Sequence, residues 1–355
     1  MSLRSLRLPT RYGRIFPPDD SWLALAEPEP IIEPDLPIID THHHLWDLRT
    51  TTGHRYVLHD YLADAQSGGH NVIGSIYMNC EAWYRTTGPE HLRCIGETDV
   101  ASGMAAMCDS AIYGPIRIAD GIVAFADLTL GDRVEEVLQA HIEAGKGRFR
   151  GIRHSGGWDA DPIIGNSFPE TTEHFYMRED FRAGLAKLTA MGLSFDAWLY
   201  HPQLHELIDL ARSFSGANII MGHCGCPLGY GPYKGKRDEV FAAWKKSMTA
   251  LAQCPNVSIK LGGMMMRLAA YDYNVVPRPP SSAELCEMWR PYIETCIELF
   301  GAGRGMFESN FPVDKMGIGY KALWNAFKRI VAGASASEKN ALFNGNAQRV
   351  YRLNL

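Results

Sequence analysis

Short apolar runs alternate with segments of helical periodicity along almost the whole chain. The runs cover residues 37–40, 71–79, 121–127, 149–154, 193–199, 218–222, 256–261 and 305–308. Most of them are close to continuously apolar, which is typical of strands that are covered on both faces. The pattern therefore predicts eight buried, parallel strands.

Amphipathic segments that fit helices lie between most of these runs. Residues 132–144 place their apolar side chains on one stripe of a helix. Ser281 and Glu284 fit a capping box at the start of another helix. The same periodicity predicts helices over residues 132–144, 179–191, 203–214, 237–253, 284–300 and 320–332.

This alternation favours an α/β fold, a single (β/α)8 barrel (TIM barrel) over residues 37–355, because eight strand–helix units follow one another without a break in composition. The Pro-rich residues 1–36 are interpreted as an N-terminal arm. An open doubly wound sheet is the alternative. Such a sheet usually has a Gly-rich, phosphate-binding turn after its first strand, whereas this turn carries histidines.

Composition narrows the classes of partner. The 355 residues are 46% hydrophobic and carry a formal net charge of −5 without a long basic run, so we expect neither nucleic acid nor an anionic membrane as a partner. No apolar stretch reaches the roughly eighteen residues that a membrane span needs. Eight scattered cysteines without a C-x-x-C pair predict a reduced, cytoplasmic protein. The expected partner is a small-molecule substrate, and a homo-oligomer is compatible with the sequence.

The end of the first predicted strand carries a pair of histidines that could bind a metal ion. Because successive side chains of a strand point to opposite faces, His42 and His44 point the same way and His43 turns away. Neutral imidazoles so placed form a pincer for a divalent ion such as zinc. The alternative is that one histidine caps the strand, another packs against Trp46, and no metal binds.

Six more strand ends carry side chains that can do chemistry, and in a barrel all of these ends meet at one rim. The candidates are Glu81, Arg153, His154, His201, His223, Lys260, Glu308, Asn310 and Asp314. Five imidazoles on one rim predict an active site. Arg153, His154 and Lys260 are candidates for binding an anionic or oxygen-rich substrate. The alternative is that Arg153 pairs with Asp196 or Glu81 across the barrel.

Several stretches give the chain a resemblance to a known family. The opening I-D-T-H-x-H-x-W-D at residues 38–47 resembles the amidohydrolase superfamily, specifically its amidohydrolase-2 branch of barrel hydrolases, lactonases and decarboxylases. Residues 149–154, 220–227, 256–263 and 306–313 agree in the same order, and residues 346–351 resemble the extra C-terminal helix of the family. Within the branch the chain looks most similar to the lactonase-like group.

The resemblance implies a role for each matched residue. His42 and His44 match the metal ligands of the first strand, and His201 lies near the ligand of the fifth. His223 matches the histidine that orients or polarises substrate or water. The eighth strand departs from the family, since Asn310 stands where an aspartate ligand and base is usual.

An amide ligates a dication more weakly than a carboxylate and cannot accept a proton near neutral pH. Two outcomes remain open. Glu308, Asp314 or Glu81 takes over as base or ligand, or the site works without a tightly held metal through its His and Arg groups. We expect a divalent ion, with zinc the first candidate, that is optional or weakly bound.

We therefore expect a hydrolase that opens a lactone, a sugar lactone or one from aromatic catabolism, by attack of water on the ring carbonyl. Two alternatives stay open. One is a metal-dependent decarboxylase of an aromatic or related acid. The other is a barrel that binds a metabolite without turnover, for which Asn310 is the main support.

Overall fold

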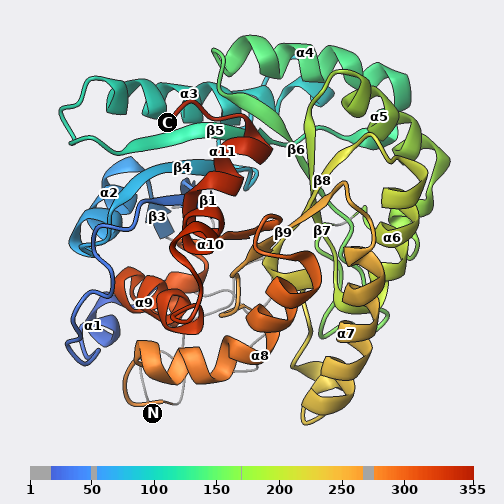
Figure 1. Cartoon of the computed structure of the whole chain (residues 1–355). Helices are drawn as coiled ribbons and strands as arrows, with labels where there is room; N and C mark the ends of the chain where they lie inside the picture. The colour runs from blue at the N-terminus through green and yellow to red at the C-terminus, as the bar shows by residue number, and fades with distance from the viewer. Residues whose placement is uncertain (1–16, 49–53, 169, 267–275) are drawn as a thin grey trace.

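The computed structural model describes residues 17–48, 54–168, 170–266 and 276–355. Eight parallel strands form one sheet in the order β1-β4-β5-β6-β7-β8-β9-β10, which confirms the predicted (β/α)8 barrel (Figure 1). The strands are β1 (Ile38–His43), β4 (Val72–Met78), β5 (Arg117–Ala124), β6 (Phe149–Ser155), β7 (Ser194–Trp198), β8 (Asn218–Met221), β9 (Val257–Leu261) and β10 (Gly305–Phe307).

The barrel closes just beyond β10 through two backbone hydrogen bonds to β1. The amide of Asn310 donates to the carbonyl of His42 at 2.8 Å, and the amide of His44 donates to the carbonyl of Phe311 at 2.7 Å. The His42–His44 segment and the segment after β10 are therefore fixed side by side at the carboxyl ends of the strands.

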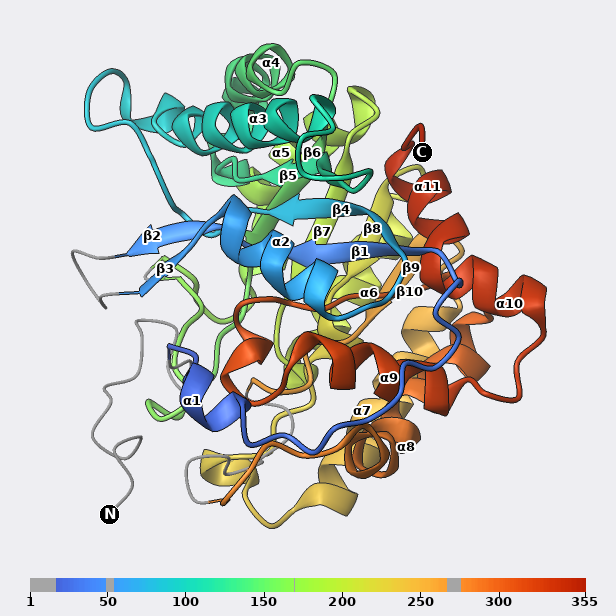
Figure 2. The ribbon, with the colours of Figure 1, turned by 90° about the vertical axis from the view of Figure 1, so that its left-hand side faces the viewer.

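Helices surround the sheet (Figures 1 and 2). They are α2 (Leu58–Ser67), α3 (Ile95–Asp109), α4 (Val134–Ala144), α5 (Glu179–Ala190), α6 (Leu204–Ser213), α7 (Arg237–Ala252), α8 (Ser282–Phe300) and α9 (Tyr320–Ile330). Six of them, α4 to α9, follow the strands where the periodicity predicts, whereas α2 and α3 were not predicted. Ser281 accepts from the amide of Glu284 and caps α8 as expected. Among the helices of the described ranges, none is both long and apolar enough to cross a membrane.

Two short strands, β2 (Trp46–Leu48) and β3 (His54–Tyr56), were not predicted. They form an antiparallel hairpin that extends from the rim beyond β1 (Figure 2). Strand β5 also begins at Arg117, four residues before the predicted start, and a positive φ at Ala119 interrupts its regular register.

The chain before β1 packs along the outside of the barrel. Residues 1–16 of the predicted arm lie outside the described residues, and α1 (Asp20–Leu23) opens the described part. Asn325 of α9 donates to the carboxylate of Glu29 at 2.9 Å and accepts from the amide of Ile32. These bonds fix residues 29–32 against α9.

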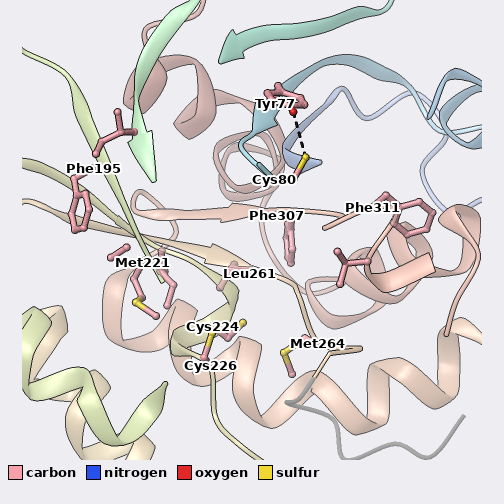
Figure 3. Packing of buried hydrophobic residues seen from close by; sticks show 14 of the residues in the cluster. Tyr77, Cys80, Phe195, Met221, Cys224, Cys226, Leu261, Met264, Phe307 and Phe311 are labelled. Atoms are coloured by element: carbon pink, nitrogen blue, oxygen red, sulfur yellow. Dashed lines mark hydrogen bonds between the residues drawn. The ribbon is translucent and has the colours of Figure 1, made fainter. Parts of the chain in front are cut away.

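The apolar core lies on both faces of the sheet because strand side chains alternate between them. Met221 and Phe307 pack outward among the helices (Figure 3). Their neighbours Ile220 and Met306 pack inside the barrel against Tyr351. Tyr351 belongs to α11 (Asn346–Tyr351), the C-terminal helix, which follows the short helix α10 (Ala336–Asn340).

Helix α11 covers the amino-terminal mouth of the barrel. Asn346 donates to the carbonyl of Gly305, the first residue of β10, and Asn218, the first of β8, donates to the carbonyl of Val350. The opposite mouth, where the strands end, is the one that carries the candidate chemistry.

Candidate active site

Strand β1 delivers His42 and His44 to the carboxyl-end mouth of the barrel. All six residues of β1 are buried. Nε2 of His42 lies 3.1 Å from Nε2 of His44. His43 faces away, where its Nε2 contacts Ser75 Oγ at 2.9 Å and its ring stacks on Tyr61. The alternation of side chains along β1 thus places His42 and His44 on one side of the strand and His43 on the other.

A single carboxylate, that of Glu308, holds two imidazoles from different strands. Its Oε2 lies 2.8 Å from Nδ1 of His42, and its Oε1 lies 2.7 Å from Nδ1 of His223. The backbone amide of His223 also donates to Oε1, at 3.0 Å. The rings of His42 and His223 lie 4.6 Å apart, tilted by 40°. Glu308, just after β10, therefore orders the site.

These contacts fix the tautomers of two of the imidazoles. Carboxylate and carbonyl oxygens only accept, so Nδ1 carries the hydrogen in His223, which contacts Glu308, and in His44, whose Nδ1 lies 2.9 Å from the carbonyl of Met78. Nδ1 of His42 lies 2.8 Å from Glu308 without hydrogen-bond geometry, so this contact does not set its tautomer. Burial lowers the pKa of His42 and His44 well below the usual value; the charges of Lys260 and Arg153 lower it further for His42, and that of Arg153 for His44. Both rings are therefore neutral, and His44 keeps its lone pair on Nε2.

Nε2 of His42 and Nε2 of His44 lie 3.1 Å apart, at hydrogen-bond distance. A zinc ion bound at about 2.0–2.1 Å by tetrahedral ligands separates its donor atoms by roughly 3.3 Å, so this spacing fits a shared divalent ion. Ligand atoms of His42, His223 and Glu308 also lie within 4.8 Å of one another. The Glu308–His42 contact is of the kind that orients histidine ligands.

Arg153 of β6 brings a positive charge to the same place. Its Nη1 lies 3.5 Å from Nε2 of His42, its Nε donates to the side chain of Asn79 at 2.8 Å, and its Nη2 donates to the carbonyl of Asn79. Asn79 was not among the predicted site residues, although its position at the end of a predicted strand was a usable signal. Asn79 aims the guanidinium at the imidazoles.

Lys260 lies inside the barrel and is fully buried. Its ammonium lies 2.9 Å from Oδ1 of Asp196, and Tyr351 donates to the same oxygen at 2.6 Å. The predicted alternative partner of Arg153, Asp196, is thus paired with Lys260. Lys260 acts on the site through its field, since its charge contributes to the lowered pKa of His42.

Asn310 occupies a left-handed backbone position, with φ of 54°. Its amide donates to Oδ1 of Asp314 at 2.8 Å, and the backbone amide of Met265 donates to Oδ2 of Asp314 at 3.3 Å. Burial raises the pKa of Asp314 to about 8, so this side chain is largely protonated at neutral pH. Of the two carboxylates considered after β10, Glu308 is the one that contacts the histidines.

The remaining candidates lie around the rim. Nδ1 of His201 accepts from the amide of Leu228 at 3.2 Å and its ring packs on Tyr233, so this histidine, which follows β7, is held against the loop after β8. Nδ1 of His154 accepts from the amide of Leu128, and its ring lies among phenylalanines. His154 and Glu81 line a cavity of about 1060 Å³ beside the ends of β4, β5 and β6.

Comparison with known proteins places the chain among relatives of similar length. The sequence profile of the amidohydrolase family matches residues 39–353. The chain is 34% identical to the uncharacterized protein y4mH of Sinorhizobium fredii, over 90% of this chain and 99% of that protein. It is 24% identical to an L-fucono-1,5-lactonase of Burkholderia multivorans, over 89% and 96% of the two chains.

Solved structures share the fold. An amidohydrolase from Burkholderia multivorans with bound zinc superposes with a TM-score of 0.65 at 24% identity, covering 89% of this chain and 99% of that one. A probable 2-pyrone-4,6-dicarboxylic acid hydrolase from Acinetobacter baumannii gives a TM-score of 0.61 at 14% identity, covering 89% and 99%.

Proposed function

The chain belongs to the amidohydrolase family, and from this premise we propose that it opens a lactone by attack of water on the ring carbonyl. The relation to L-fucono-1,5-lactonase supports a sugar lactone first and a lactone from aromatic catabolism second. One observation carries the proposal: a carboxylate is shared by two imidazoles, and one of these imidazoles lies beside a half-buried guanidinium, which puts a base and an oxyanion partner in one place.

His223 is the proposed general base. Its Nδ1 hydrogen is held by Glu308, so Nε2 is free to take the proton of the attacking water. The imidazolium that forms lies against the carboxylate of Glu308, which stabilises its charge in a water-poor site. The same ring then returns the proton to the ring oxygen that leaves as an alcohol.

Arg153 is the proposed partner of the developing oxyanion. Asn79 fixes its guanidinium through Nε and Nη2, which leaves Nη1 directed toward His42. A carbonyl oxygen placed beside Nη1 gains a charge-assisted hydrogen bond as negative charge builds on it. Asn310 and Asp314 are proposed to position the backbone after β10, through the bond from Asn310 to His42.

His42 and His44 would hold the divalent ion, and zinc suits their donor atoms. When bound, zinc polarises a carbonyl and lowers the pKa of a bound water. His201, the third ligand expected from the resemblance, would have to leave its bond with Leu228 to take part. We therefore propose His42 and His44 as the core of the ligand set. The cavity lined by His154 and Glu81 is proposed to accept the part of the substrate outside the ring.

The experiment is a panel of sugar lactones and aromatic-derived lactones, with acid release recorded by a pH indicator. We expect acid release from at least one lactone and its loss in a Glu308→Gln variant. Carbon dioxide release from hydroxybenzoate-type acids, without acid release from any lactone, would instead identify a decarboxylase. Binding of a lactone without turnover would identify a metabolite-binding barrel.

A further inference from the structure

A second group of metal-binding side chains lies outside the barrel mouth. His174 belongs to the loop after β6 and precedes a short turn at Phe175–Met177, whereas His205 and Glu206 lie in the first turn of α6. One ligand atom from each of the three residues lies within 4.8 Å of the other two. None of the three belongs to the site described above.

Glu206 is a buried carboxylate that lacks a full positive partner. Its side chain is 2% exposed. It accepts from the amide of Tyr176 at 3.1 Å and from the side chain of Gln203 at 3.2 Å. Within the described part of the chain its one ion-pair contact is Nδ1 of His174, at 4.0 Å. A desolvated carboxylate gains most from a nearby cation, and neither neutral donor supplies one.

The two imidazoles lie near this carboxylate and come from separate segments. Nδ1 of His205 lies 3.1 Å from the carbonyl of Pro202 and therefore carries the hydrogen, which leaves a lone pair on Nε2. The rings of His174 and His205 meet edge to face with centres 5.9 Å apart. His174 holds a left-handed backbone conformation, φ 59° and ψ 32°, which a non-glycine residue seldom adopts without a local reason.

We propose that His174, His205 and Glu206 form a second divalent-metal site, of the class that zinc occupies. Two imidazoles and one carboxylate are a ligand set that zinc uses with three protein ligands and an open fourth position. The side chain of His174 is 59% exposed, so it can approach the buried carboxylate without disturbing the core.

Such a site would fix a wall of the substrate cavity. Phe175 and Arg178, one and four residues after His174, line the cavity that His154 and Glu81 also line. A metal that joins His174 to α6 would hold the loop after β6 in place. The proposal does not depend on what the barrel mouth hydrolyses, because it concerns metal binding by residues outside it.

The experiment measures zinc bound per chain after chelation, reloading and desalting. We compare the wild type with a His174→Asn/His205→Gln double variant, because asparagine tolerates the left-handed conformation at position 174. His91→Gln is the matched control, since His91 is an exposed histidine beside a single carboxylate, Glu136, at 3.1 Å. Unchanged far-ultraviolet circular dichroism establishes that the variants fold.

The double variant is expected to bind one zinc equivalent fewer than the wild type, and the control the same number. Zinc should also slow hydrogen exchange over residues 170–178 in the wild type and not in the double variant. Equal stoichiometry in all three proteins would overturn the proposal. The proposal would also be overturned if the wild type itself did not retain this zinc equivalent at low micromolar zinc, because the bound zinc would then be an adventitious ion only.

Discussion

Nε2 of His42 lies 3.1 Å from Nε2 of His44, whose hydrogen sits on Nδ1 and faces the carbonyl of Met78. The lone pair of His44 therefore faces Nε2 of His42, and the two nitrogens either share a hydrogen or share a cation. Arg153 stands 3.5 Å from Nε2 of His42, and a divalent ion fits the same pair. The site is thus a cluster of neutral imidazoles with a positive charge beside it.

Glu308→Gln tests the role of the shared carboxylate. Glutamine offers one acceptor where the carboxylate offers two, so one imidazole must face an amide hydrogen and change its tautomer. We expect kcat/KM for the preferred lactone to fall by about 10²–10⁴, as for other carboxylates that orient a catalytic histidine. The control is Glu143→Gln on the exposed face of α4, which should keep full activity. Equal rates in the two variants would contradict the assignment.

Lys260→Met tests the buried ion pair beneath the site. The change removes the cation beside the buried carboxylate of Asp196, to which Tyr351 still donates. We expect urea denaturation to show that the free energy of unfolding falls by about 3–5 kcal/mol. The same measurement on Lys246→Met, at an exposed position of α7, should show almost no change. The Lys260→Met/Asp196→Leu double variant should recover part of the loss. A stable single variant would mean that Asp196 needs no cation.

Asp314→Asn tests the raised pKa of a buried carboxyl. Burial raises this pKa to about 8 from 3.8, so between these values the folded protein holds a proton that the unfolded chain releases. The stabilisation from that proton is complete below about pH 4 and is lost as pH rises through 8. We expect the Tm of Asp314→Asn relative to wild type to increase between pH 5 and 9. Parallel Tm profiles, as expected for exposed Asp132→Asn, would contradict this.

Chelation tests the metal at the barrel mouth. If His42 and His44 share a divalent ion, removing it should lower lactone turnover at least tenfold, about 1.4 kcal/mol, and zinc should restore it. Arg153 would account for the remaining rate. Full turnover in chelator by protein that measurably holds no zinc would show that turnover needs no bound metal.

The order of strands and helices could be predicted from the sequence. The alternation of apolar runs with amphipathic segments stays recognisable even when the end of an element is misplaced by one or two residues. The sequence also placed His42 and His44 together, since they share one strand. Contacts between residues of different strands were harder to predict. Glu308 and Asp314 both follow the last strand, and only the backbone path through Asn310 decides that Glu308 meets the histidines.

The side on which a strand-end residue falls was equally hard to predict. Arg153 and His154 are neighbours, yet Arg153 reaches Asn79 inside the barrel and His154 packs outward on Phe175. A side-chain period of two makes a single-residue shift sufficient to exchange them. His201 lies beyond the end of β7, in a turn whose course no strand pattern sets, and there it contacts Leu228.

The most direct test of the account is lactone hydrolysis by a His223→Asn variant, followed as acid release at constant pH beside the wild type. Asparagine cannot accept the proton of the attacking water, so the account predicts that kcat falls by at least about 10²-fold while the variant stays folded. A folded His223→Asn protein that opens the lactone at the wild-type rate would contradict the proposal that this imidazole, held by Glu308, is the base.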